Sequence, residues 1–244
     1  MESGFYLGTK QATMTLTPAH GSANATALVW DWPLRVFHWV LVLAVAGSFA
    51  THYAGMEWFD WHRRCGYAAA VLIGFRLAWG FVGPRYSRFS SFLRGPRAVI
   101  EHLRGRQPYP KAGHNPVGAV SVLAFLASLA MQAGTGLFAN DEIANAGPFY
   151  GWVTQETSNR LTGLHDLNSK ILIALIALHL VAVAWYDGWR RLGLVRAFWT
   201  GRKEGAEGIR ASRGGLALVI VVALIVALTL AIRAAPEASV NVYF

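Results

Sequence analysis

Two histidines lie fourteen positions apart in the almost wholly apolar stretch LHDLNSKILIALIALHLVAV (residues 164–183): His165 and His179. In an α-helix, fourteen residues correspond to about 21 Å of rise and to a rotation about 40° short of four turns. Both imidazoles therefore face the same side of one helix at two levels. Imidazole in an apolar setting is costly without a partner, and proton pathways, metal ions and cofactors are the usual reasons to keep it. A single such histidine is most often hydrogen-bonded to a neighbouring helix, but two at this spacing weaken that explanation.

The elements that must position these histidines are membrane-spanning helices. The 244 residues are 54% hydrophobic and only 14% charged, whereas soluble domains are about 25% charged. Five apolar stretches are long enough to cross a hydrocarbon core of about 30 Å. The fold class predicted is an all-α integral membrane protein, with a four-helix bundle and a fifth C-terminal helix. The spans expected are about Leu34 to Ala54, Tyr67 to Val82, Pro116 to Phe138, His165 to Tyr186 and Gly214 to Ile232.

Basic residues are unevenly distributed among the connections. Seven Lys and Arg stand against one acid between the second and third spans, and after the fourth span seven stand against two acids from Arg190 to Arg213. The connection from Asn140 to Leu164 instead has three acids and one Arg. Because cationic loops stay in the cytoplasm, this pattern predicts a cytoplasmic N-terminus and an outer C-terminus. The same residues face anionic lipid headgroups, which accounts for the isoelectric point of about 10.1 without a nucleic-acid partner.

Other helices offer histidines at matching depths. His38 lies near the cytoplasmic start of the first span, level with His179. His62 precedes the second span on the outer side, level with His165. Two cross-helix pairs about 20 Å apart are what two axially ligated haems require. His52 lies fourteen residues after His38 on the same helix face and competes with His62 for the outer level, so spacing alone leaves two arrangements open.

The remaining histidines and the cysteine narrow the type of cofactor. His20, His102 and His114 lie in polar segments and are expected to be solvated or interfacial. Cys65 is the only cysteine and no C-x-x-C-H motif exists, so covalent haem attachment is excluded and the haems would be b-type. With two histidines on each iron no coordination position is open, which favours electron transfer over oxygen chemistry.

Four segments together resemble the bacterial dihaem cytochrome b561 family, in particular the b-type cytochrome subunits of nickel-iron hydrogenases. They are WDWPLRVFHWVL, HRRCGYAAAVLIGFRLAWGFVGP, GHNPVGA and LHDLNSKILIALIALHLVAV, within about residues 30 to 203. The resemblance implies a bacterial inner-membrane bundle that holds two haem b and exchanges electrons with ubiquinone or menaquinone. It places the axial ligands, which are also the iron ligands, on His38 paired with His179 and on His62 paired with His165. The segment GGLALVIVVALIVALTLAI departs from many relatives.

Two further residues are candidate cofactor-binding groups. Arg76 lies fourteen residues after His62, hence on the same helix face at the inner level, where a haem propionate or the membrane interface could take its charge. Asn115, with His114 in GHNP, could supply polar groups to a quinone at the inner mouth of the third span.

The resulting hypothesis is a dihaem electron conduit, either a quinone-linked oxidoreductase or the cytochrome b subunit of one. Its expected partners are lipid and quinone, with a periplasmic c-type cytochrome, a dehydrogenase or hydrogenase subunit, and a second copy of the chain as candidates. The alternative is a proton or metal transporter that uses the buried histidines. The near absence of carboxylates within the membrane spans argues against it. Three regions are expected: a loose tail at 1–28, the haem domain at 29–203, and a linker with the additional helix at 204–244.

Overall fold

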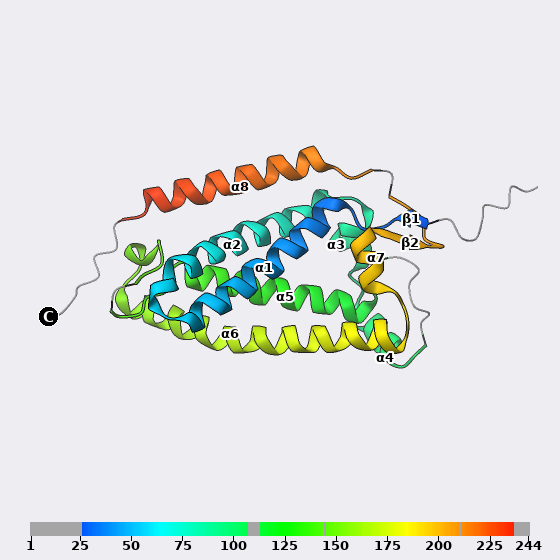
Figure 1. Ribbon diagram of the computed structural model, residues 1–244, viewed down its shortest axis with the longest axis horizontal. Coiled ribbons are helices and arrows are strands. Elements are labelled where there is room, and N and C mark those ends of the chain that lie inside the picture. The colour runs from blue at the N-terminus through cyan, green and yellow to red at the C-terminus, as the bar shows by residue number, and fades with distance from the viewer. Residues whose placement is uncertain (1–25, 107–112, 144, 210, 237–244) are drawn as a thin grey trace, which may run out of the picture.

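The computed structural model describes residues 26–106, 113–143, 145–209 and 211–236. Within these residues, five helices are long and apolar enough to cross a membrane. They confirm the predicted all-α membrane fold (Figure 1). The elements are β1 (Thr26–Leu28), α1 (Trp32–Ala54), a 3₁₀ turn (Met56–Trp58), α2 (Phe59–Val82), a 3₁₀ turn (Arg85–Ser87), α3 (Phe89–Phe92), α4 (Pro96–Leu103), α5 (Pro116–Gly136), a 3₁₀ turn (Tyr150–Trp152), α6 (Gln155–Ala184), a π-helical turn (Trp185–Trp189), α7 (Leu194–Thr200), β2 (Arg202–Glu204) and α8 (Gly214–Ala234).

Two helical hairpins form the bundle. α1 packs against α2, α5 packs against α6, and α2 joins the hairpins by packing against α5. Apolar side chains from three helices fill the junction: Ile73 of α2, Leu126 and Leu129 of α5, and Leu172 of α6. α1 and α5 each begin with a proline in the first turn, where the missing N–H costs no helical hydrogen bond.

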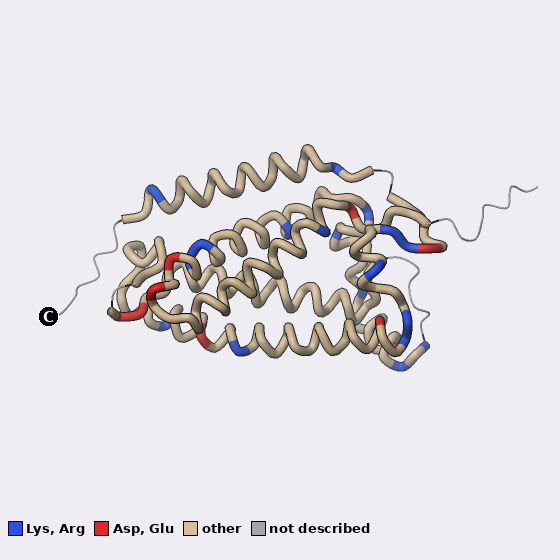
Figure 2. The backbone as a smooth tube through the Cα atoms, in the orientation of Figure 1, with Lys and Arg blue, Asp and Glu red and all other residues tan. Residues whose placement is uncertain are grey.

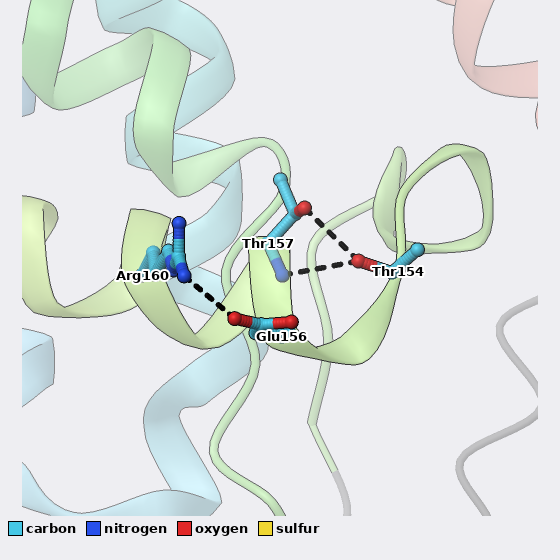
Figure 3. A network of polar contacts seen from close by, with 4 residues as sticks. All are labelled: Thr154, Glu156, Thr157 and Arg160. Atoms are coloured by element: carbon cyan, nitrogen blue, oxygen red, sulfur yellow. Dashed lines mark hydrogen bonds and ion pairs between the residues drawn. The ribbon is translucent and has the colours of Figure 1, made fainter.

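Two helices begin earlier than the apolar pattern predicts. α2 starts at Phe59 and α6 at Gln155, eight and ten residues before the expected spans. In α6 the Thr154 side chain accepts a hydrogen bond from the Thr157 backbone N–H at 3.2 Å, and Arg160 pairs with Glu156 at 2.6 Å (Figure 3). A side-chain cap and an i,i+4 ion pair stabilise a polar first turn that hydropathy does not detect. His165 therefore lies well inside its helix.

The fifth helix is part of the packed structure. α8 runs along α2 on the outside of the bundle (Figure 1). Ala217 of α8 is buried with Phe37 of α1 and with Phe75 and Trp79 of α2. At Gly74 of α2, a Cβ atom would meet the Leu224 side chain of α8 at 3.2 Å. The bundle thus has four helices around its centre and one docked on α2.

The sequence predicts a loose N-terminal tail, but the end of this tail forms a strand. Residues 26–28 form β1, which pairs antiparallel with β2, with Ala27 opposite Lys203. The rest of the predicted tail, His20 included, lies outside the described residues. The connection between α2 and α5 contains the short helices α3 and α4. Figure 2 shows that Lys and Arg gather at the end of the bundle that carries the strands.

Candidate functional site

The outer level of the bundle brings three histidines together. The ring centroids of His62 on α2 and His165 on α6 are 6.3 Å apart, with the ring planes at 78°. His52 on α1 lies 5.9 Å from His62, but its side chain is exposed, whereas the other two are partly buried. The structure therefore faces His62 toward His165 and leaves His52 at the edge of the group.

Backbone carbonyls orient the two inward-facing imidazoles. His62 Nδ1 lies 2.9 Å from the Ser48 carbonyl of α1, and His165 Nδ1 lies 3.0 Å from the Gln132 carbonyl of α5. A carbonyl can only accept, so each Nδ1 carries the proton and each Nε2 has a free lone pair. A hydrogen bond from Nδ1 fixes the tautomer and the ring orientation in which a histidine can bind a metal ion through Nε2.

One glycine allows the outer arrangement. A Cβ atom at Gly136 would meet His165 Cε1 at 2.9 Å and Nδ1 at 3.2 Å. A Cβ at Gly134 would meet nothing within 4 Å. Of the two glycines only Gly136 is required to be small, because its missing side chain leaves room for the His165 imidazole.

The inner level contains the second predicted pair. His38 on α1 and His179 on α6 lie near each other at this level. His38 Nδ1 is buried without a hydrogen-bond partner, and its ring contacts Phe198 of α7 at 4.9 Å between centroids. The His179 ring packs against Phe125 of α5 at 5.5 Å. Histidines thus lie near one another toward each end of the bundle.

Arg76 is enclosed by protein at the inner end and does not extend to the surface. Its side chain is 3% exposed, and its guanidinium lies 4.9 Å from the centre of the Phe89 ring. One terminal nitrogen, NH1, is buried without a hydrogen-bond partner. Asp31 acts on it electrostatically, but the Asp31 carboxylate accepts hydrogen bonds from Trp79 and Ser87. A buried guanidinium with an unused donor suits an anionic ligand.

His114, expected to be solvated or interfacial, is partly buried rather than freely solvated. Its ring lies between Trp30, at 5.0 Å, and Phe92, at 4.8 Å, and its Nδ1 is buried without a hydrogen-bond partner. Burial, and secondly the charge of Arg76, lowers the pKa of His114 to about 4. His114 is therefore a neutral imidazole beside a cation near the inner histidine pair.

Asn115 has a defined structural task. It is 6% exposed, and its Oδ1 accepts a hydrogen bond from the Gly118 backbone N–H at 2.6 Å, which caps α5. Removing a side-chain cap costs about 1 kcal/mol, so any change at Asn115 also affects the start of α5.

Comparison with known proteins agrees with this geometry. Residues 29–201 match the model of the family described as prokaryotic cytochrome b561. The chain belongs to this family. It is similar to the probable Ni/Fe-hydrogenase B-type cytochrome subunit of Rhodobacter capsulatus, at 26% identity over 217 residues that cover 74% of this chain and 82% of the relative. No solved structure matches the chain significantly. The protein is thus a multi-pass membrane cytochrome b561 of the b-type electron-transfer class, and haem b is the cofactor that its family implies.

The outer histidine pair of this cytochrome b561 has the spacing that two imidazoles on one metal ion require. A metal–imidazole bond is about 2 Å long, and the ring centre lies about 1 Å beyond the nitrogen, so two imidazoles on opposite sides of one metal ion have centroids roughly 6 Å apart. His62 and His165 meet that spacing at 6.3 Å. Within the described ranges, no group of three or more His, Cys, Asp or Glu residues could hold a metal ion, whereas two imidazoles suffice for a bis-histidine haem.

Sequence reasoning missed several residues around the site. Phe198 of α7 covers His38, and Gln132 of α5 holds His165 through its backbone. Asp31 is fully buried at the inner end. A backbone acceptor has no sequence signature, and α7 lies far along the chain from His38. Asp31, next to WP at the start of the first span, was the one visible signal, because a carboxylate at a membrane boundary needs partners.

Proposed function

We propose that this cytochrome b561 is a dihaem conduit that carries electrons across the bacterial inner membrane between quinone and a redox partner. His38 and His179 would hold the inner haem, and His62 and His165 the outer haem. The observation that carries the proposal is the outer pair, in which two imidazoles stand at ligand spacing with both Nδ1 atoms on backbone carbonyls.

Haem b bound by two histidines supplies a one-electron iron couple with no open coordination position. The protein's part is to hold the imidazoles, to keep water away and to set their basicity through the Nδ1 hydrogen bonds. His165 and His179 share one face of α6 about 21 Å apart along the helix. This separation puts one ligand pair near each membrane surface with a single helix spanning both.

Arg76 and His114 support a quinone and propionate site at the inner level. Each presents a buried nitrogen without a partner, and a buried polar atom left unpaired costs about 1–3 kcal/mol. Arg76 would hold a haem propionate, as its buried charge requires an anion. His114, whose ring is flanked by Trp30 and Phe92, would face the quinone head group. A ring path from His114 through Trp30 and Phe198 reaches His38.

We propose Asn115 as a second quinone contact beside His114. Because its side chain also caps α5, the variant that tests this contact must keep the cap. Asn115→Ser keeps a capping oxygen and removes the amide, whereas Asn115→Leu would remove both. We expect His114→Phe to slow haem reduction by a soluble quinol analogue while dithionite still reduces both haems fully. Asn115→Ser should slow it less. Stopped-flow spectroscopy at matched haem loading would measure both, and an unchanged rate in His114→Phe would remove the inner quinone site from the proposal.

The charge distribution supports the proposed orientation, with the N-terminus and the basic end in the cytoplasm (Figure 2). Anionic headgroups would contact the basic end, and a redox protein would dock at the outer end. The relative from Rhodobacter capsulatus is named as a hydrogenase subunit, which supports a hydrogenase-type or other dehydrogenase subunit as partner, with a c-type cytochrome as the other candidate. A homodimer is a further proposed assembly.

The decisive experiment is the haem content of the purified protein. We expect a b-type signal in the reduced-minus-oxidised visible spectrum and two haems per chain by pyridine haemochrome quantitation. A single haem would limit the conduit to one membrane face. The absence of any b-type signal would overturn the proposal and favour the transporter alternative.

A further inference from the structure

A buried polar cluster joins α5 to α6 one turn from His165, toward the centre of the bundle. Asn168 is 2% exposed and Ser128 is 6% exposed. Ser128 Oγ donates to Asn168 Oδ1 at 3.0 Å. Asn168 Nδ2 in turn donates to the Ser128 carbonyl at 2.9 Å and to Gln132 Oε1 at 2.6 Å. Three hydrogen bonds thus connect one amide side chain to one turn of the neighbouring helix.

The same turn holds His165. The Gln132 carbonyl accepts from His165 Nδ1 at 3.0 Å, while the Gln132 side chain accepts from Asn168. In an α-helix the Ser128 carbonyl is also the acceptor for the Gln132 N–H. Asn168 therefore binds the helical turn from Ser128 to Gln132, and the carbonyl at the end of this turn is the one that accepts the hydrogen bond of His165. Ser128 and Gln132 are four residues apart and His165 and Asn168 three, so each pair shares one helix face.

Packing alone does not explain these polar residues. The next residue along this face of α6, Leu172, is 2% exposed and fills the junction with α2 and α5 by apolar contact. Hydrogen bonds between membrane helices add little stability on average, because the separated helices also find partners. A leucine would serve helix association equally well at Asn168, whereas only a polar side chain can fix the turn at Gln132.

We propose that Asn168 is a positioning residue for His165, which locks the Ser128–Gln132 turn against α6 and so sets the direction in which the Gln132 carbonyl holds the imidazole. This inference rests on the proposed role of His165 as a ligand of the outer haem. The angle of 78° between the His62 and His165 rings is the geometric quantity that Asn168 would maintain.

The inference can be tested by electron paramagnetic resonance of the ferric protein. Nearly perpendicular imidazole planes give a strongly anisotropic low-spin signal, and planes nearer to parallel give a more rhombic one. Measurements use the full-length chain in a His179→Ala background, which leaves the outer haem alone, and are repeated with both haems present. We expect Asn168→Leu to broaden the outer signal or make it more rhombic. We also expect a higher midpoint potential, because a weaker hydrogen bond to Nδ1 makes His165 less basic.

A second variant and a matched control separate positioning from packing. Gln132→Leu removes the acceptor of Asn168 but keeps the carbonyl that His165 uses, and it should change the signal in the same direction. The double variant should change it no more than Asn168→Leu does, since both break one link. Leu172→Ala removes apolar packing from the same face, and it should lower thermal stability while leaving the signal and the potential unchanged.

The outcomes distinguish this inference from the proposed function. A His179→Ala protein without haem, or a His165→Ala protein that keeps the outer haem, would overturn the ligand assignment itself. Unchanged signal and potential in Gln132→Leu and Asn168→Leu, with haem retained, would overturn the positioning role alone. If Asn168→Leu does not accumulate in the membrane, Gln132→Leu decides the question by the same criterion.

Discussion

Substituting Gly136 by alanine tests whether the outer site requires His165 in its observed place. The added Cβ would lie 2.9 Å from Cε1 and 3.2 Å from Nδ1 of His165, closer than van der Waals contact allows. The imidazole must then move away from α5, which lengthens the 3.0 Å hydrogen bond to the Gln132 carbonyl. The backbone of α5 gains helix propensity in the same substitution, so the two effects oppose each other.

The magnitudes decide which effect wins. Alanine in place of glycine stabilises a helix interior by at most about 1 kcal/mol, and Gly136 is the last residue of α5, where the gain is smaller. Overpacking a well-filled site costs about 1–3 kcal/mol. If the site bears that cost, haem affinity at the outer level falls by about 5- to 150-fold. Haem at the inner level, which does not contact Gly136, should be retained.

Haem content and thermal stability of Gly136→Ala and Gly134→Ala would be measured side by side. Gly134 lies two residues earlier in the same helix with open space around its Cβ position, so its substitution should keep both haems and not lower the melting temperature. Equal haem content in the two variants would refute the reasoning, because the contact with His165 is what distinguishes them.

Three further predictions follow from the histidines. His62→Ala should lose one haem and His52→Ala should keep both, because His62 faces His165 whereas His52 is exposed; haemochrome quantitation showing the reverse would assign the ligand to α1. His38→Ala and His179→Ala should each lose the same haem, identified by its midpoint potential, and different losses would break the pair. Burial and the charge of Arg76 lower the pKa of His114 from 6.5 to about 4, so the unfolded chain binds the proton first as the pH falls. The free energy of unfolding should therefore fall by up to about 3 kcal/mol between pH 6.5 and pH 4. Unfolding of His114→Phe in detergent should lack this pH dependence.

The positions of the histidines along their helices could be predicted from sequence. Apolar length identifies a membrane helix because the hydrocarbon thickness is fixed, and helical periodicity places His165 and His179 on one face at two levels. Both properties belong to one continuous segment. The resemblance over residues 30–203 added the family, which the match over residues 29–201 confirms.

The starts of α2 and α6 were wrong by eight and ten residues. Hydropathy detects contact with lipid, and it does not detect a polar first turn. In α6 this turn is stabilised by the Thr154 cap and by the ion pair of Glu156 with Arg160. The strand at 26–28 was missed because its partner, residues 202–204, lies far along the chain. A two-stranded pair depends on that distant partner more than on local propensity.

By itself, the sequence determined that this chain crosses the membrane as apolar helices with histidines at two levels, since length, periodicity and charge act within a segment. Helix spacing fits both His52 and His62 and the family resemblance favours His62, but only the tertiary structure shows the His62 ring 6.3 Å from that of His165. It also decided that the partly buried His114 lies beside the buried Arg76, and that the Gln132 carbonyl holds His165. The physical reason is that burial and hydrogen-bond partners depend on which helices pack side by side, and the contacts that fix this packing are made between residues far apart in the chain.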